Sequence, residues 1–443
     1  MEGSSDFRIK ELVNSICRLL LGVETKFNED SSILKINNEN LSEYGDVCFL
    51  TNLVTWKKVF RNSLKSTTSC RNILEHYLIK NEIKFEDCNA AEKAFQNIIK
   101  ASRNWSLKIE KCQLGNERVS VFLNRTQTFA DVLARIVVRD HSYGQLESKS
   151  GSFFFHIIKD LDSDLTNLRL RLIKRVAENI VKANGYQVSE SSDSDKYYAT
   201  TKSKRDLTKY PKILLCGVAK NSVTGTKETA LTEAEYLNRR LVELADTTEH
   251  KLPDLAEPKH EQNSVLLQIA EAVIVLQFLA VKPSRTITIS SDLGLDESTI
   301  NVKGSSFIFY NTARISAIFQ KFDEQHLKGD YPSLPSIEEV DFSLLTEAEE
   351  WELMYIFLLG YPEMVKTCAR LTGDLEICPH YICSFLSRLV SKFSAYYRRV
   401  RILTEGRDHL LPTMMARLYL LKAIQIVTRN ALRLLNLDPV SRM

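Results

Sequence analysis

The feature that most restricts the fold of this sequence is a strand–helix–strand pattern in its second quarter. Phe153–Ile158 is an apolar run of the length expected for a buried strand. Helical spacing follows over Asp164–Ala183 and meets Asn184-Gly185, a typical stop at a helix C-terminus. Tyr186–Val188 then resumes an extended pattern. Because parallel strands are joined by a crossover helix, this order predicts a βαβ unit and hence an α/β sheet.

The chain around this unit divides by pattern into four regions. They are an N-terminal α+β region 1–145, an α/β core 146–261, a helical connecting region 262–345 and a helical domain 346–443. A length of 443 residues fits several domains of roughly 150 residues each. We therefore expect an α+β protein overall, in which a reduced, Rossmann-like α/β core is followed by an all-α helical bundle.

Single elements and linkers can also be placed. We predict helices over Phe7–Leu21, Thr128–Val138 and Ala230–Leu244, and strands at Val119–Leu123 and Ile213–Val218. The polar segments 189–210 and 249–261 are interpreted as linkers, and no strong strand signal follows residue 289.

The spacing of the glycines excludes several cofactor sites. No two of the 15 glycines are separated by a single residue, so the G-x-G loops that bind dinucleotides or a methyl donor are absent. The sequence also has no G-x4-G-K-[ST] loop, no G-x-S-x-G elbow and no H-E-x-x-H motif. We therefore expect no cofactor.

The cysteines indicate free thiols rather than disulfides or a metal. The 9 cysteines include no C-x-x-C pair, which favours a reducing compartment, the cytoplasm. The closest approach to a metal cluster is Cys378-Pro-His380-Tyr-Ile-Cys383, which lacks an evident fourth ligand. We interpret it as core thiols of a helix that begins at Pro379.

Neither secretion nor membrane insertion is expected. The N-terminal residues MEGSSDFRIK carry charges early and have no apolar core of signal-peptide length. The most apolar stretch, Val265–Val281, is interrupted by Gln268, Glu271 and Gln277, so we interpret it as a buried helix.

The net charge of +3 hides a strong asymmetry in the helical part. Asp323–Glu376 holds 13 acids and 3 bases, a balance of −10, whereas Arg388–Met443 holds 11 bases and 3 acids, a balance of +8. Such an asymmetry is typical of a surface that meets a charged partner. The excess of bases in the last 56 residues predicts that the partner is a polyanion.

The last helical segment places bases opposite its apolar stripe. Apolar residues from Ala416 to Leu434 recur at spacings of three and four, so one face is expected in the core. Lys422, Arg429 and Arg433 fall together on the opposite face, where they either bind a phosphate backbone or simply meet solvent.

The preceding helix ends in the run Tyr396-Tyr397-Arg398-Arg399-Val400-Arg401. Tyrosine rings and guanidinium planes are the groups that stack on unpaired RNA bases. We expect Arg398, Arg399 and Arg401 to contact phosphate and only one of the two tyrosines to face outward.

These residues resemble the DALR anticodon-binding domain of arginyl-tRNA synthetases over Glu350–Met443. The resemblance runs through Pro379-His380, Phe385-Leu386, Tyr396-Tyr397, Ala416-Arg417-Leu418 and the end of the chain, Leu434 to Met443. The helix that contains Tyr310 to Ile318 looks like the synthetase helix leading into this domain. The resemblance implies tRNA binding by the following residues: Tyr396, Tyr397, Arg398, Arg399, Arg401, Arg417, Lys422, Arg429 and Arg433.

The synthetase resemblance continues upstream with two departures. Leu168 and Arg169 match the end of the His-x-Gly-His-Leu-Arg signature, but both histidines are replaced around Leu165–Asn167. Where the Lys-Met-Ser-Lys-Ser loop is expected, the chain has Ser222-Val-Thr-Gly-Thr-Lys227, with one displaced lysine. Leu and Asn cannot stabilise the phosphates of ATP as histidines do. Residues 1–145 resemble the additional N-terminal domain of the synthetase.

The combination resembles the metazoan family of non-catalytic proteins that contain a DALR anticodon-binding domain. Thr224-Gly-Thr, Lys303–Arg314, Tyr331-Pro332 and Asp341–Leu345 match that family. Membership would imply an adaptor, not an enzyme, that binds arginine tRNAs. It would present them to a methyltransferase-like enzyme that makes 3-methylcytidine in the anticodon loop. The alternatives are a scaffold that has lost tRNA binding and a divergent arginyl-tRNA ligase.

One surface is a candidate for docking the methyltransferase. Glu338–Glu352 is acidic and contains Trp351, and such a surface would attract a basic partner. The alternative interpretation is a solvated helix that is capped by Thr346, with Glu349 three residues later.

Overall fold

The structure is a computed structural model. It describes residues 9–22, 33–60, 70–86, 88–191, 194–202, 210, 212–249, 259–289 and 298–439. The chain divides into two compact units, each built from segments that are distant in sequence. The first unit comprises Met1–Val138, Leu334–Gly360 and Asp408–Leu420, and the second comprises Arg139–Ser333, Tyr361–Arg407 and Leu421–Met443. The long last helix therefore begins in the first unit and ends in the second.

The first unit contains an antiparallel four-stranded sheet with the order β1-β2-β4-β3. Its strands are β1 (Leu34–Ile36), β2 (Val47–Leu50), β3 (Ile109–Leu114) and β4 (Arg118–Leu123). Its helices are α1 (Ile9–Leu21), α2 (Leu41–Tyr44), α3 (Leu53–Val59), α4 (Ile73–Lys80), α5 (Ala90–Ser102), α6 (Arg125–Arg139), α11 (Ala348–Glu352) and the π-helix η5 (Leu353–Leu358), with the short η3 (Ile337–Glu339) and η4 (Phe342–Leu344).

An aromatic pair lies in the core of this unit. Phe129 of α6 and Trp351 of α11 are buried, with ring centroids 5.6 Å apart in an edge-to-face arrangement. Because α6 and α11 are far apart in the sequence, this contact fixes the later segment onto the N-terminal one.

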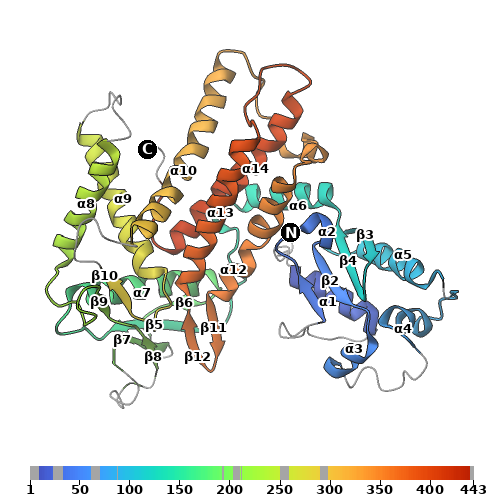
Figure 1. Ribbon diagram of the computed structural model, residues 1–443, viewed down its shortest axis with the longest axis horizontal. Coiled ribbons are helices and arrows are strands. Elements are labelled where there is room, and N and C mark those ends of the chain that lie inside the picture. Colours follow the sequence, from blue (N-terminus) through green and yellow to red (C-terminus); the bar gives the residue numbers. More distant parts are fainter. Residues whose placement is uncertain are drawn as a thin grey trace. The chain divides into compact units, whose positions relative to one another are not determined.

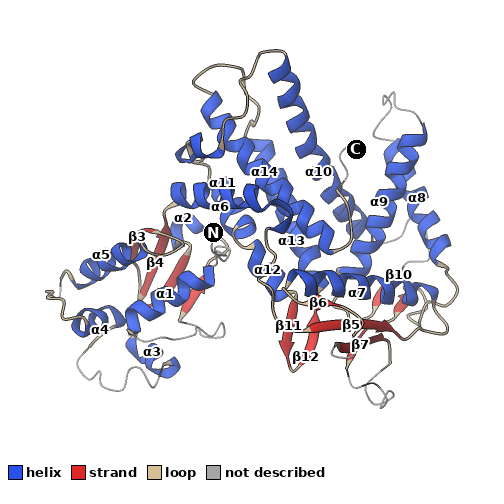
Figure 2. Ribbon diagram, turned by 180° about the vertical axis from the view of Figure 1, so that it is seen from behind, coloured by secondary structure: helices blue, strands red, loops and turns tan. Residues whose placement is uncertain are grey.

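The second unit contains a parallel sheet with the order β6-β5-β7-β8, and α7 lies along it (Figure 2). Its elements are β5 (Ser152–Ile157), α7 (Asp164–Ala183), β6 (Gln187–Val188), β7 (Asp195–Thr200) and β8 (Ile213–Leu215). A second parallel pair joins β9 (Ala219–Asn221) to β10 (Ile287–Ile289). The predicted βαβ unit is confirmed, and α7 has the predicted bounds.

The rest of the second unit is mainly helical. Its elements are η1 (Asp140–Ser142), α8 (Glu233–Glu249), α9 (Lys259–Leu279), α10 (Ser298–Leu327), α12 (Tyr361–Thr367), α13 (Pro379–Arg399) and the end of α14 (Leu411–Leu434). α9 packs against both α8 and α10, and α10 packs against α13 (Figure 1). None of the described helices is long and apolar enough to cross a membrane.

Two predictions about strands were wrong. The segment 189–210 is not only a linker, because Asp195–Thr200 forms β7, which is paired on both sides by β5 and β8. A strand pair also follows residue 289: β11 (Ala369–Thr372) and β12 (Asp374–Ile377) form an antiparallel hairpin. All three strands are short and lie in polar sequence, which gives a weak strand signal. The partners of β7 come from distant segments, whereas β11 and β12 pair with each other across Gly373. Most of the other proposed linker, residues 250–258, lies outside the described residues.

Candidate functional site

The two neighbouring tyrosines at the C-terminal end of α13 differ in exposure. Tyr396 is 0% exposed, so it belongs to the core and cannot stack on a base. Tyr397 is half-buried, and Arg398, Arg399 and Arg401 are exposed. The expectation that only one tyrosine faces outward is confirmed, and Tyr396 leaves the set of candidate contacts. Pro379 is the first residue of this helix, as predicted.

Beside Tyr397 the structure forms a stacked platform of two tyrosines and one arginine. The guanidinium carbon of Arg314 lies 4.5 Å from the ring centroid of Tyr310 and 4.8 Å from that of Tyr397. Nη2 of Arg314 donates to the Tyr310 hydroxyl at 2.7 Å, and Nη1 donates to Asn311 Oδ1 at 3.3 Å. Tyr310 is 47% exposed. The platform thus offers a fixed aromatic and cationic surface next to exposed arginines.

Sequence reasoning placed Tyr397 in the site but missed Tyr310 and Arg314. Both lie on α10, in the helix that the sequence analysis had linked to the synthetases. Their spacing of four residues puts them on one helix face, and that was the available signal. The contact with Tyr397 on α13 could come only from the packing of the two helices.

α14 is packed on most of its circumference, and this changes the role of two predicted bases. Arg417 is paired with Glu350, at 2.9 Å from its Nε to the carboxylate. Arg429 is paired with Asp140. Arg429 is half-buried, and this ion pair already partly neutralises its charge within the protein. Lys422 is half-buried and Arg433 is exposed.

The acidic segment also differs from expectation. Trp351 is 1% exposed and donates from Nε1 to Asp46 Oδ1 at 2.7 Å, and Glu350 is 0% exposed. Neither side chain is available to dock a partner. The capping box of α11 is formed by Glu347 and Glu350, not by Thr346 and Glu349.

The α/β core contains an ion-pair cluster around Lys227. Lys227, the lysine of the second signature position, is paired with Asp160 and with Asp162, the latter at 3.1 Å. Although burial opposes ionisation of both groups, their hydrogen bond holds the pKa of Asp160 below and that of Lys227 above the ordinary value. The charge of this lysine is already neutralised within the protein.

The residues at the first signature position serve the fold. Thr166 is buried, and its hydroxyl accepts from the backbone N–H of Ala219 at 3.2 Å. Asn167 donates to the carbonyls of Asp160 and Ser163 at 2.9 and 3.0 Å. These bonds close the loop in front of α7 instead of presenting donors to a ligand.

The cysteine cluster lies in the core, as predicted. Cys378 and Cys383 are buried, and burial raises the pKa of the Cys383 thiol to about 12. Among the described residues no group of three His, Cys, Asp or Glu side chains is arranged to hold a metal ion.

Comparison with known proteins shows a likeness to an anticodon-binding domain and to the fold of arginyl-tRNA synthetases. Residues 308–443 match the family model of the DALR anticodon binding domain. The structure is similar to Thermus thermophilus arginyl-tRNA synthetase, with a TM-score of 0.62 and 11% identity, covering 98% of this chain and 100% of that one. The enzyme from Plasmodium falciparum is similar with a TM-score of 0.61 and 10% identity, covering 99% and 100%. These likenesses show the fold.

About half of the chain is similar in sequence to proteins named DALR anticodon-binding domain-containing protein 3. It is 33% identical to the Mus musculus protein of that name over 241 residues, which are 52% of this chain and 43% of that protein. It is 27% identical to the Danio rerio protein over 238 residues, 52% and 42% of the two chains. The arginine–tRNA ligase of Geobacter metallireducens is 32% identical over 167 residues, 38% and 26%. The chain thus spans less than half the length of the curated relatives it matches.

Proposed function

We propose that this protein is a non-catalytic adaptor that binds arginine tRNAs through its DALR domain. It presents the anticodon arm to a methyltransferase-like enzyme, which forms 3-methylcytidine there. The observation that carries the binding part is the platform of Tyr310, Arg314 and Tyr397 beside Arg398, Arg399 and Arg401. Unpaired bases stack on such a platform while the adjacent guanidinium groups neutralise phosphates.

The proposal that the protein is not an enzyme rests on Lys227. Adenylate formation needs cations that are free to bind the phosphates of ATP, and Lys227 is held by Asp160 and Asp162. The absence of any G-x-G loop from the sequence means that the partner must bind the methyl donor. We place this role in the cytoplasm, with no cofactor and no membrane partner.

The first experiment identifies the RNA that a tagged full-length chain retains in cells, by sequencing after washes at two salt concentrations. Arginine tRNAs should be enriched, and retention should fall with salt because several phosphates are contacted. Arg398→Glu/Arg399→Glu should abolish retention. Arg388→Glu/Lys392→Glu is the matched control, because it also reverses two charges on α13 but lies nearer the middle of the helix. Retention that is equal in both double variants would contradict the proposed surface.

The adaptor step requires a second measurement. The methyltransferase should co-purify with the chain, and arginine tRNA from cells without the protein should lose 3-methylcytidine. A chain that binds the methyltransferase but no tRNA would instead be a scaffold. Arginine-dependent ATP–pyrophosphate exchange by the pure protein would establish the divergent ligase.

A further inference from the structure

The parallel sheet of the second unit is covered by helices on one face only. In Figure 1 and Figure 2 the helices, α7 among them, lie on one side of β5, β7 and β8, and no described helix lies on the other side. The inward residues Phe153, Phe155 and Tyr197 are buried, as this arrangement requires. Sheets that are entirely parallel are almost always covered on both faces, so the outward face is suited to a partner.

The outward face of this sheet carries a row of rings. Because side chains alternate between the two faces of a strand, Phe154 and His156 of β5 share the outward face with Tyr198 of β7. The rings of His156 and Tyr198 are stacked, with centroids 5.1 Å apart and planes 13° apart. Phe154 meets His156 edge to face at 4.6 Å, and Tyr210 lies 4.3 Å from Tyr198. These four residues, the aromatic row, are half-buried, so part of each ring stays accessible.

The outward positions of the strands hold a base and no carboxylate. Lys196 is exposed and lies directly opposite Phe154 in the register of β5 and β7. The other outward positions are uncharged, and they are Ser152, Gln187, Thr200, Ile213 and Leu215. Rings and positive charge without acids are complementary to a polyanion that carries flat groups.

Lysines also follow two of the strands. Lys159 comes after β5 and Lys202 after β7, and both are exposed at the carboxyl edge of the sheet. Two carboxylates near the strand ends are already paired, Asp160 with Lys227 and Asp195 with Lys212. A negatively charged chain that crosses the aromatic row from Lys196 would therefore reach a second pair of lysines.

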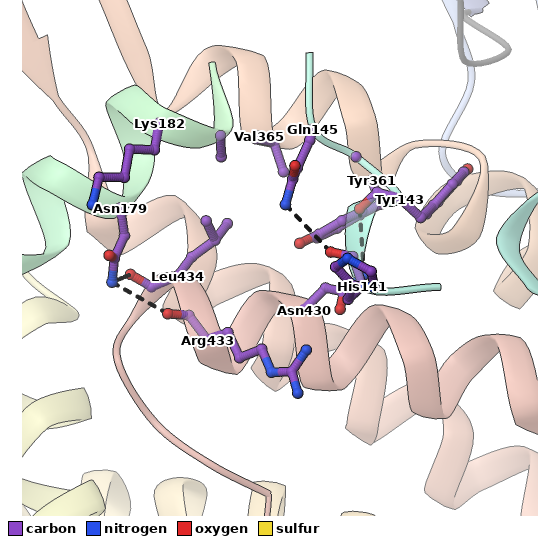
Figure 3. A pocket seen from close by; sticks show the side chains of 12 residues that line it. His141, Tyr143, Gln145, Asn179, Lys182, Tyr361, Val365, Asn430, Arg433 and Leu434 are labelled. Atoms are coloured by element: carbon purple, nitrogen blue, oxygen red, sulfur yellow. Dashed lines mark hydrogen bonds between the residues drawn. The ribbon is translucent and has the colours of Figure 1, made fainter. Parts of the chain in front are cut away.

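The cavity of about 280 Å³ between α7, α12 and α14 does not offer this combination. Its cations Lys182 and Arg433 extend away from each other, so they do not converge on one phosphate (Figure 3). In this unit, rings and lysines come together on the outward face of the sheet instead.

We propose that this outward face binds unpaired nucleotides of RNA, with bases stacked on the aromatic row and phosphates at Lys196. Unpaired bases stack on Phe, Tyr and His rings, and a four-stranded sheet can present such rings to RNA. Lysine is depleted in the centres of protein–protein interfaces, so Lys196 beside Phe154 favours RNA over a protein partner.

This site is separate from the stacked platform. β12 contacts β8 and leads into the first residue of α13, Pro379, whereas Tyr397 and its arginines lie at the other end of that helix. A helix of 21 residues spans about 30 Å, so the two surfaces are far enough apart to hold different nucleotides. The inference does not depend on the identity of the tRNA that the platform binds.

The test measures binding of a short labelled oligouridine to the full chain that carries Arg398→Glu/Arg399→Glu, so that the platform contributes little. Lys196→Glu and His156→Ala should each weaken binding roughly tenfold or more, because a phosphate contact or a stacking ring is lost. His156→Phe keeps a ring and should preserve binding. Lys182→Glu is the matched control, because Lys182 is exposed on α7, which covers the other face. Equal binding by all variants overturns the proposal, and so does a parent chain that binds no oligouridine.

A second measurement needs no substitution. Ultraviolet cross-linking of the oligouridine to the original chain, followed by mass spectrometry, should mark peptides that contain Phe154, Tyr198 or Tyr210. Cross-links confined to α10 and α13 would overturn the proposal. Unchanged RNA binding by Lys196→Glu, together with lost co-purification of the methyltransferase, would make this face a protein interface and also overturn it. If no arginine tRNA is retained but oligouridine binding still requires Lys196, the adaptor proposal fails and this one stands.

Discussion

The carboxylate of Glu350 is fully buried, and one of its oxygens accepts a hydrogen bond from Nε of Arg417 at 2.9 Å. Its other oxygen accepts from the backbone N–H of Glu347 at 3.0 Å, which closes the capping box of α11. One side chain therefore joins the start of α11 to α14. Arg417, which the sequence had suggested as an RNA contact, is committed to this pair.

Removal of Arg417 should destabilise the protein strongly. Arg417→Ala removes a cation that is paired with the buried Glu350 carboxylate, and such a loss costs about 3–5 kcal/mol of the free energy of unfolding. Urea denaturation followed by tryptophan fluorescence measures it, because Trp351 is the neighbour of Glu350. Arg433→Ala, an exposed position on the same helix, should stay within about 0.5 kcal/mol. Similar losses in the two variants would show that the buried pair contributes little to the free energy of unfolding.

The titration of Asp46 should lower the free energy of unfolding as the pH rises from about 4 to about 6. Burial raises the pKa of Asp46 to about 6, although hydrogen bonds from Leu123 and Trp351 partly oppose this. Between the ordinary pKa and this value the folded protein holds a proton that the unfolded chain has released. Its stability is therefore highest below this window and declines through it, by about 1.4 kcal/mol per pH unit.

The variant Asp46→Asn isolates this effect, since asparagine does not titrate. Denaturation midpoints of both proteins across pH 4 to 7 should differ in slope, with the decline weaker in the variant. Parallel curves would mean that Asp46 titrates at its ordinary pKa.

Tyr397→Ala should weaken RNA binding by removing one side of the stacked platform. Loss of one base-stacking ring costs about 1–3 kcal/mol of binding free energy. Filter binding of arginine tRNA measures it at fixed salt. Tyr381→Ala is the matched control, because Tyr381 lies at the other end of α13 and has its own arginine, Arg370, 5.5 Å from its ring. A loss of equal size there would argue against a localised platform.

Two glycine substitutions should shift stability in opposite directions. Gly185 follows α7 with φ +88°, and a Cβ would lie 2.0 Å from the carbonyl oxygen of Glu147, so Gly185→Ala should cost more than about 1 kcal/mol. Gly304 lies within α10 with open space around it, and Gly304→Ala should add about 0.5–1 kcal/mol. Thermal unfolding of both variants checks the pair, and a stable Gly185→Ala protein would be the unexpected result.

Elements with strong local signals could be predicted from the sequence. α7 has an apolar stripe, a cap at Ser163 and a glycine that ends it, and all of these signals lie within the helix or directly beside it. Its predicted bounds are those of the structure. The start of α13 at Pro379 was predictable for the same reason, because proline fixes φ and needs no N–H at the first helical position.

Where partners come from distant segments, the sequence was not enough. The sequence of β7 predicts a polar linker. In the structure it is an inner strand of the parallel sheet, because β5 and β8 form hydrogen-bonded pairs with it on either side. The helical pattern of α14 predicts one face in the core. Only the packed structure shows that Arg429 is paired with Asp140 and Arg417 with Glu350.

By itself, the sequence determined several of the helices, the parallel core and the basic character of the C-terminal end. These properties depend on residue type and on spacing along the chain. The tertiary structure decided which bases remain on the surface, and it brought Arg314 between Tyr310 and Tyr397. Such pairings depend on how helices pack, because the free energy of a charge or a ring is set by the neighbours that surround it in space.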